Sequence, residues 1–290
     1  MAGRASVVAR RAEELLGTPV VATSPVAGGD VSRATKLRLN DGSVALMKTL
    51  PHPPAGFFRA EARGLRWLAE AGLPTPALLA SADDCVILRW VEPGRPAGDG
   101  AVELGRALAA AHQHGCDAFG LAEDGFIGPL PMPNRTALTW PEFYATRRLL
   151  PYLKLARDRG GIDDDQARTV EAVVPRLERL LPAEPPSRLH GDLWNGNVLW
   201  GSDGRAWVID PAAYGGHREM DLAMLALFGL PQLERVVDAY TEAHPLSDGW
   251  EDRIALHQLF PLLVHAAMFG RSQGYGARAA TLAGRYVTTT

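Results

Sequence analysis

The chain has 290 residues, of which 47% are hydrophobic and 22% charged, with a formal net charge of −3, values typical of a globular protein large enough for two lobes with separate cores. Its pI is near 6.2, so the chain lacks the basic character of nucleic-acid-binding proteins. No apolar run approaches the roughly 18 residues that cross a bilayer, and residues 1–16 lack the apolar core of a signal peptide, so we expect a cytoplasmic protein with no nucleic-acid or membrane partner.

Residues 1–92 are predicted to form an N-terminal lobe built on an antiparallel sheet. An amphipathic helix at 5–16 opens this lobe, and Asn40-Asp41-Gly42 is typical of a hairpin turn. Apolar residues at helical spacing predict one further helix at 57–71. Runs with strand character lie at 20–21, 34–39, 44–48, 78–80 and 85–91.

Residues 93–290 are predicted to form a larger, mainly helical C-terminal lobe. A sheet lobe followed by a helical lobe makes an α+β fold with two lobes. Helical patterns occur at 102–114, 140–157, 164–181, 219–229, 231–243, 249–270 and 276–286.

The segment from His190 to Asp210 carries three polar residues at the spacing of a phosphoryl-transfer site. Asp192 and Asn197 form an Asp-x-x-x-x-Asn unit, and Asp210 follows a short apolar strand predicted at 206–209. In kinases this Asp handles the proton of the acceptor hydroxyl, the Asn holds Mg²⁺, and a later Asp is the second metal ligand. The spacing alone also occurs by chance, because Asp and Asn are common turn residues. We expect Asp192 to be the catalytic base, and Asn197 and Asp210 to bind Mg²⁺.

The N-terminal lobe contains candidates for binding the phosphates of ATP. Gly28, Gly29 and Ser32 form a turn between strands, where backbone N–H groups can approach phosphates closely. Lys48 ends an apolar strand, as the phosphate-binding lysine does in kinases, and Glu61 on the next helix is its expected partner. The alternative is that Lys48 and Glu61 are surface residues and that the glycines form only a turn.

Two further groups of residues are expected around this site. Adenine would contact the backbone at Trp90 and Glu92, where the first lobe ends. His190, Glu219 and Asp221 would support the catalytic loop, with Asp221 accepting hydrogen bonds from its backbone. Glu219 and Asp221 could equally be helix-start carboxylates that interact with a helix dipole.

Together these motifs resemble the fructosamine kinase (ketosamine 3-kinase) family, within the aminoglycoside phosphotransferase-like branch of the protein-kinase-like fold. The resemblance rests on His-Gly-Asp-Leu-Trp-Asn-Gly-Asn at 190–197 and on the more specific Asp-Pro-Ala-Ala-Tyr-Gly-Gly-His-Arg-Glu at 210–219. It implies ATP- and Mg²⁺-dependent phosphorylation of the 3-hydroxyl of a ketosamine, either a small molecule or bound to a protein. The product is unstable, so the family's activity removes the sugar. Carried over onto this chain, the resemblance gives Asp192, Asn197, Asp210, Lys48 and Glu61 the roles above.

The acceptor site is expected next to the catalytic loop, because polar groups beside an aromatic surface suit a sugar. The candidates are Trp194, Tyr214, His217, Arg218 and Asn134. His217 could instead be a structural histidine that bonds the backbone.

Two other functions remain open from the sequence. An aminoglycoside or other small-molecule kinase would share the catalytic loop, although a polycationic acceptor is disfavoured by a group of arginines: Arg147, Arg148, Arg157 and Arg159. A kinase-like binding module without transfer activity is the second alternative. The presence of Lys48, Asp192, Asn197 and Asp210 argues against it.

Overall fold

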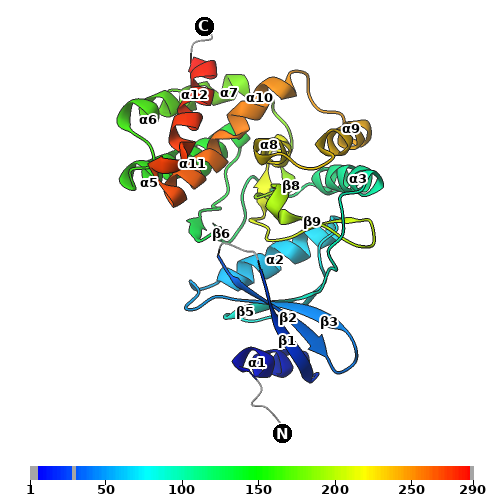
Figure 1. Ribbon diagram of the computed structural model, residues 1–290. Coiled ribbons are helices and arrows are strands. Elements are labelled where there is room, and N and C mark those ends of the chain that lie inside the picture. The colour runs from blue at the N-terminus through cyan, green and yellow to red at the C-terminus, as the bar shows by residue number, and fades with distance from the viewer. Residues whose placement is uncertain (1–5, 28–30, 288–290) are drawn as a thin grey trace.

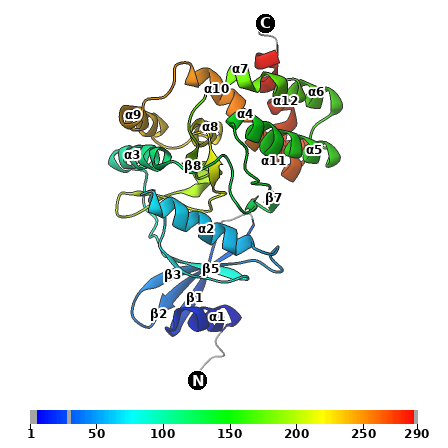
Figure 2. The same cartoon turned by 180° about the vertical axis from the view of Figure 1, so that it is seen from behind.

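The computed structural model describes residues 6–27 and 31–287, and these form two lobes (Figure 1 and Figure 2). The smaller lobe holds a five-stranded sheet in the order β1-β2-β3-β5-β4, in which every neighbouring pair is antiparallel. The larger lobe is mainly helical. The predicted α+β architecture with two lobes is therefore confirmed.

The smaller lobe follows the predicted order of elements, with longer strands than expected at its start. Ser6 caps the first helix by accepting a hydrogen bond from the Ala9 N–H. The elements are α1 (Val7–Leu16), β1 (Val20–Val26), β2 (Arg33–Leu39), β3 (Val44–Thr49), α2 (Phe57–Glu70), β4 (Leu78–Ser81) and β5 (Cys85–Arg89).

Both faces of the sheet are covered by a helix, and this fixes where the strand side chains point. In β5, Cys85 and Ile87 pack with Ala12 of α1, whereas Val86 and Leu88 pack with α2. Successive side chains of a strand face opposite sides, so a continuous apolar run is required at 85–88. The same alternation in β3 brings Lys48 to the α2 side.

The larger lobe is built around a helical core, into which several three-residue strands are inserted. Three of the predicted helices are divided, and the six-residue segment 144–149 between α4 and α5 is π-helical. The elements are α3 (Gly98–His114), β6 (Gly125–Ile127), β7 (Leu130–Met132), α4 (Trp140–Phe143), α5 (Leu150–Asp158), α6 (Asp164–Glu171), α7 (Leu177–Leu180), β8 (Ser187–Leu189), β9 (Val198–Trp200), β10 (Ala206–Val208), β11 (Tyr214–Gly216), α8 (Glu219–Phe228), α9 (Leu233–Ala243), α10 (Trp250–His257), α11 (Leu259–Phe269) and α12 (Tyr275–Val287).

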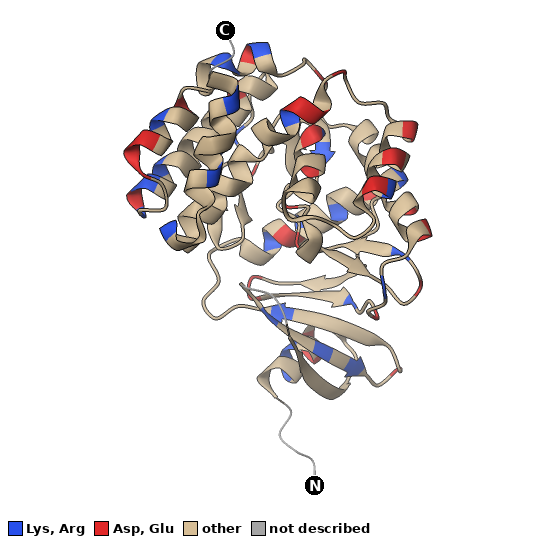
Figure 3. Cartoon of the chain, turned by 45° about the horizontal axis from the view of Figure 1, so that its top comes forward, with Lys and Arg blue, Asp and Glu red and all other residues tan. Residues whose placement is uncertain are grey.

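Charged residues are distributed along the helices of the larger lobe, with basic and acidic side chains interspersed in the view of Figure 3. Within residues 6–27 and 31–287, no helix is both long and apolar enough to cross a membrane.

Candidate active site

Two short antiparallel ladders bring the predicted catalytic residues together. β8 pairs with β11, and β9 pairs with β10. The loop with Asp192 runs from β8 to β9, and Asp210 lies between β10 and β11. The Ile209 N–H donates to the Asn197 carbonyl over 3.0 Å, so Asn197 and Asp210 lie next to each other at the end of the β9–β10 ladder.

Asp192 is held by Asn197 across the loop. The Asn197 side chain donates from Nδ2 to the Asp192 carbonyl over 2.8 Å and to its Oδ2 over 3.1 Å, which leaves the amide oxygen of Asn197 for another ligand. Burial raises the pKa of Asp192 to about 7, an effect opposed by the Asn197 hydrogen bond and reinforced by the charges of Asp210 and Asp221.

Lys48 connects the two lobes at this site. Its ammonium donates to Glu61 Oε1 over 2.6 Å and to Asp210 Oδ1 over 2.7 Å. Burial alone would favour the neutral amine, but the two carboxylates raise the pKa of Lys48 above its usual range. Lys48 and Glu61 are both buried, so neither is the surface residue of the alternative interpretation.

Asp210 has a backbone conformation that is unusual for its residue type. Its φ of 55° lies in the left-handed region, which non-glycine residues rarely adopt and which is enriched at functional sites. Asp and Asn tolerate this region better than most residues. The turn aims the carboxylate at Lys48, and 39% of its side chain stays exposed.

Asp221, near the start of α8, anchors the catalytic loop. Asp221 accepts hydrogen bonds from the N–H groups of His190 (2.7 Å) and Gly191 (2.9 Å). Gly191 has a φ of 80°, and a Cβ there would lie 2.0 Å from the Ala212 carbonyl oxygen, so only glycine fits. His190 Nε2 lies 2.9 Å from the Ile209 carbonyl, and its Nδ1 accepts from the Asp192 N–H. His190 therefore links the loop to the chain before Asp210.

One residue of this anchor was not anticipated from the sequence. His112, near the end of α3, is buried with Nε2 3.3 Å from Asp221 Oδ2 and Nδ1 2.8 Å from the Tyr240 hydroxyl. Its role could not be read from the sequence, because its partners lie more than 100 residues away in the sequence.

Four of the five predicted substrate residues lie inside the larger lobe, which corrects the expectation that they contact an acceptor. Tyr214, His217 and Asn134 have no exposed surface, and only 6% of Arg218 is exposed. Arg218 forms a two-point ion pair with Glu184. Trp194 is the exception: it is half-buried on the catalytic loop and packs edge-on against Phe228 at 5.8 Å.

Asn134 and Tyr214 belong to a cluster around a buried arginine. Arg148 donates to Asn134 Oδ1 over 2.7 Å and to the Pro133 carbonyl over 2.7 Å, and its guanidinium lies 3.9 Å from the Tyr214 ring centre. Arg148 has no exposed surface, so it cannot repel a cationic acceptor. The sequence argument against such acceptors was wrong for this residue.

Glu219 supports α10 and makes none of its described contacts to the catalytic loop. Its carboxylate pairs with Arg253 through three hydrogen bonds. One of its oxygens and one ring nitrogen each of His217 and His257 lie within 4.8 Å of one another, as ligands of a metal would.

The hydrogen bonds of this cluster argue against a metal. His257 Nε2 accepts from the Trp140 N–H over 3.3 Å, so Nδ1 carries the proton and faces Glu219 at 3.4 Å. His217 Nδ1 accepts from the Glu219 N–H, so its Nε2–H faces Glu184 at 3.7 Å. A histidine binds a metal through a ring nitrogen that has a free lone pair. In both of these rings, the nitrogen that faces a carboxylate carries a proton instead. We therefore interpret the cluster as a network of neutral histidines and ion pairs.

In the segment that joins the lobes, two backbone groups at the predicted adenine positions have no main-chain hydrogen-bond partner among those described. The Trp90 N–H donates to the Val44 carbonyl, and the Glu92 carbonyl accepts from the Ser202 N–H. Among the described main-chain hydrogen bonds, the Trp90 carbonyl and the Glu92 N–H have no partner. Of the predicted phosphate turn, Gly28 and Gly29 lie outside the described residues, and Ser32 is half-buried just before β2.

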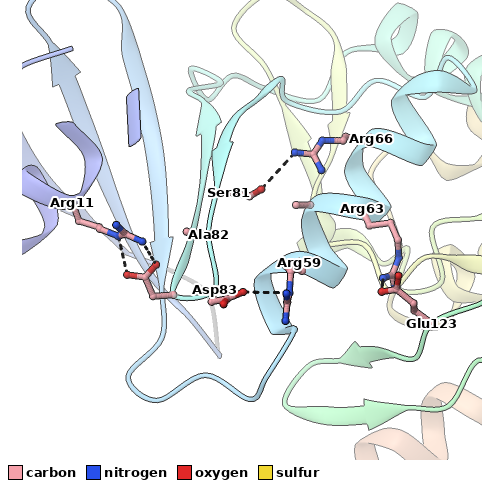
Figure 4. Close-up of a pocket in the computed structure, with 10 residues that line it drawn as sticks. Arg11, Arg59, Arg63, Arg66, Ser81, Ala82, Asp83 and Glu123 are labelled. Carbon is pink, nitrogen blue, oxygen red and sulfur yellow. Dashed lines mark hydrogen bonds and ion pairs between the residues drawn. The ribbon is translucent and has the colours of Figure 1, made fainter. Parts of the chain in front are cut away.

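A cavity of about 850 Å³ lies between α2 and the β4–β5 turn and does not include Lys48 or Glu61 in its lining (Figure 4). Three of its arginines already pair with carboxylates: Arg11 with Asp84, Arg59 with Asp83, and Arg63 with Glu123. The fourth, Arg66, lies 3.5 Å from the Ser81 hydroxyl. Because its charges are largely compensated, we assign no ligand to this cavity.

Comparisons with known proteins agree with this geometry. A probable ketoamine kinase of Thermus thermophilus is 38% identical over 256 residues, which cover 87% of this chain and 88% of that protein. The chloroplastic protein-ribulosamine 3-kinase of Arabidopsis thaliana is 32% identical, over 93% of this chain and 84% of that protein.

Solved structures give the same result for the fold. A crystal structure from Thermobifida fusca, named as a candidate fructosamine-3-kinase, is 48% identical with a TM-score of 0.91, and the match covers 98% of this chain and 99% of that one. A macrolide 2′-phosphotransferase at 18% identity shares the fold with a TM-score of 0.65, so the predicted kinase-like fold is confirmed. The family described as fructosamine kinase matches residues 5–288, and the chain belongs to that family.

Proposed function

We propose that this chain transfers the γ-phosphoryl group of ATP to the 3-hydroxyl of a ketosamine. Membership of the fructosamine kinase family makes the chain an ATP-dependent phosphotransferase. The observation that carries the assignment of the site is the convergence of Lys48, Asp210, Asn197 and Asp192 at one place between the lobes. Phosphoryl transfer depends mainly on positioning and charge stabilisation, and this set of residues supplies both.

Asp192 is the general base in this proposal. Its carboxylate would orient the acceptor hydroxyl and take its proton as the phosphoryl group arrives. The Asn197 hydrogen bond to Oδ2 fixes one carboxylate oxygen, which leaves Oδ1 to face the hydroxyl. The Asp221 contacts to the loop backbone hold the base in place.

Asn197 and Asp210 would hold the Mg²⁺ that accompanies ATP. Their oxygens are the hard ligands that Mg²⁺ prefers, and the Asp210 carboxylate is partly exposed. When bound, the metal would neutralise charge on the transferring phosphate. Lys48 is kept charged by its two carboxylates and would contact the other phosphates. The Trp90 carbonyl and Glu92 N–H fit the donor and acceptor edge of adenine.

The acceptor is inferred from relatives. One relative is named as a ketoamine kinase and another as a protein-ribulosamine 3-kinase, which supports a sugar joined to an amine. The 3-phosphate of such a sugar is unstable, so transfer would lead to release of the amine, and the enzyme would deglycate small molecules or proteins.

Replacing Asp192 with Asn tests the assignment of the base. Asn is nearly isosteric but cannot accept the proton, so we expect kcat to fall by about 100-fold or more with the KM for ATP nearly unchanged. The assay couples ADP formation to fructosyl-lysine, ribulosyl-lysine or kanamycin as acceptor. Full turnover by the variant would reject Asp192 as the base. Wild-type turnover of kanamycin without turnover of either ketosamine would reject the proposed acceptor.

A further inference from the structure

A row of aromatic side chains runs from the catalytic loop to the surface of the larger lobe. Ring centres are 5.8 Å apart between Trp194 and Phe228, 5.0 Å between Phe228 and His265, and 5.7 Å between His265 and Phe269. Tyr275 lies 4.9 Å from His265. We call these five residues the aromatic wall. None of them is fully buried, and 44% of Phe269 is exposed, so the wall offers an accessible surface.

The outer end of the wall, at the end of α11, lies on the side of the larger lobe that faces the smaller lobe (Figure 1 and Figure 2). The wall begins two residues after Asp192. Phe269 is the last residue of α11, whose end lies near the β6–β7 hairpin in both views (Figure 1 and Figure 2). A Cβ built at Gly128, in the turn of that hairpin, would be 3.3 Å from Met268 and 4.0 Å from Val31. The outer part of the wall is therefore close to the chain that enters β2.

The chemistry of the wall fits a cation with an apolar substituent. Aromatic faces attract ammonium groups, and the last carbonyls of α11 carry partial negative charge. His265 Nδ1 lies 2.7 Å from the Pro261 carbonyl and donates to it, which leaves Nε2 as an acceptor. Burial lowers the pKa of His265, so the ring is neutral and does not repel a cation.

A ketosamine carries such a group at a fixed place relative to the reacting atom. Its amine is bonded to C1, two carbons from the 3-hydroxyl, and a secondary amine of this kind is largely protonated at neutral pH. With the 3-hydroxyl at Asp192 and the sugar against Trp194, the amine and its substituent can extend along the following rings.

We propose that the aromatic wall is the subsite for the amine substituent of the ketosamine, and that it favours amines bearing an aromatic side chain. This inference rests on the proposed function, because it places the sugar at Asp192. It adds a specificity role for Phe269 and Tyr275, which no sequence motif marks.

Kinetics with two matched acceptors test the proposal: the fructose adducts of 4-phenylbutylamine, whose chain lets the ring reach along the wall, and of butylamine. The wild-type KM for the 4-phenylbutylamine adduct should be about five- to tenfold lower, as an aromatic contact predicts. In Phe269→Ala this advantage should shrink to about twofold or less. Leu138→Ala is the control, because Leu138 is 93% exposed in the segment before α4 and should leave the advantage intact.

The outcomes separate the two proposals. Equal KM values for both adducts in the wild type would reject the aromatic wall as the subsite for the amine substituent while leaving the proposed function in place. Failure of the wild type to phosphorylate either adduct would overturn both. A retained preference in Phe269→Ala, together with a shift in sedimentation from dimer to monomer, would assign the wall to self-association instead.

Discussion

The Asp221 carboxylate accepts several of the hydrogen bonds that hold the catalytic loop in place. Two backbone N–H groups and one imidazole point at it, and the carboxylate is 1% exposed. Burial alone would raise the pKa of Asp221, but its hydrogen bond with His112 and the surrounding donors lower it. A charged acceptor with several short donors is a rigid anchor, which suits a residue that positions a base.

Replacing Asp221 with Asn should therefore impair both folding and turnover. The amide has one oxygen for two N–H donors, so its NH₂ group would face a donor in a buried site. We expect a loss of about 1–3 kcal/mol in the free energy of unfolding, measured with urea, and a fall in kcat of about tenfold or more. Asp238→Asn, on the exposed face of α9, is the control. Wild-type kcat in the folded variant would contradict the anchoring role.

The sequence predicted which polar residues of the candidate site lie together better than it predicted the residues around them. Asp192, Asn197, Asp210, Lys48 and Glu61 are brought together because their motifs tie each of them to a strand end or a helix.

The orientation of the neighbouring side chains was not predictable in the same way. Tyr214, His217 and Arg218 follow the loop closely in sequence, yet β11 and the start of α8 turn them into the core. Their partners, such as Arg148 and Glu184, lie more than 30 residues away.

At the scale of elements, prolines explain where predicted helices divide. Pro151 has no N–H to bond the Arg147 carbonyl, and Arg148 donates to that carbonyl instead. Pro261 leaves the His257 carbonyl without its helical donor, and the Tyr144 hydroxyl lies 3.2 Å from it. The strand predicted before Asp210 is β10. The strands β8, β9 and β11 escaped prediction because three residues show no periodicity.

Gly64 sets how closely α2 approaches the segment after Asp210. A Cβ at this position would lie 3.1 Å from Pro211 Cγ and 3.2 Å from Ala213 Cβ, so Gly64→Ala should displace α2 by a few tenths of an ångström. Because α2 carries Glu61, we expect kcat/KM for ATP to fall several-fold. Helix propensity favours Ala by about 1 kcal/mol, so stability need not fall.

The matched control is Gly284→Ala on α12, where a Cβ would meet nothing within 4 Å. It should gain stability without a change in ATP kinetics. Unchanged kcat/KM for ATP in Gly64→Ala would show that α2 tolerates the displacement.

Across the whole molecule, α2 ties the sheet to the larger lobe. Phe57 at its start packs against Phe126 of β6 with ring centres 5.2 Å apart. Arg63 pairs with Glu123 and donates to the Asp124 carbonyl. Leu68, near its end, belongs to the core that includes α3 and α9. The helix that positions Glu61 is thus fixed by contacts with both lobes.

Stability of the whole chain should fall on the acidic side because the larger lobe buries neutral histidines. Burial lowers the pKa of His217 from 6.5 to about 4 and that of His257 well below 6.5. At pH values between 6.5 and the lowered pKa values of the folded state, the unfolded chain binds more protons than the folded one. The stabilisation is therefore complete above about pH 6.5 and is lost as the pH falls towards 4. Glu184 adds to the loss below its ordinary pKa: burial would raise its pKa, but hydrogen bonds from Arg218 and Ser247 lower it to about 2.

Urea unfolding between pH 7.5 and 4.5 measures this dependence. We expect the free energy of unfolding to fall by about 1 kcal/mol or more per pH unit below 6.5. His217→Gln keeps a donor at the position of Nε2 and cannot be protonated, so the slope should become shallower in this variant. His114→Gln, at an exposed position near the end of α3, should leave the slope unchanged. A slope in His217→Gln equal to that of the wild type would show that the buried histidines are not the groups that take up the protons.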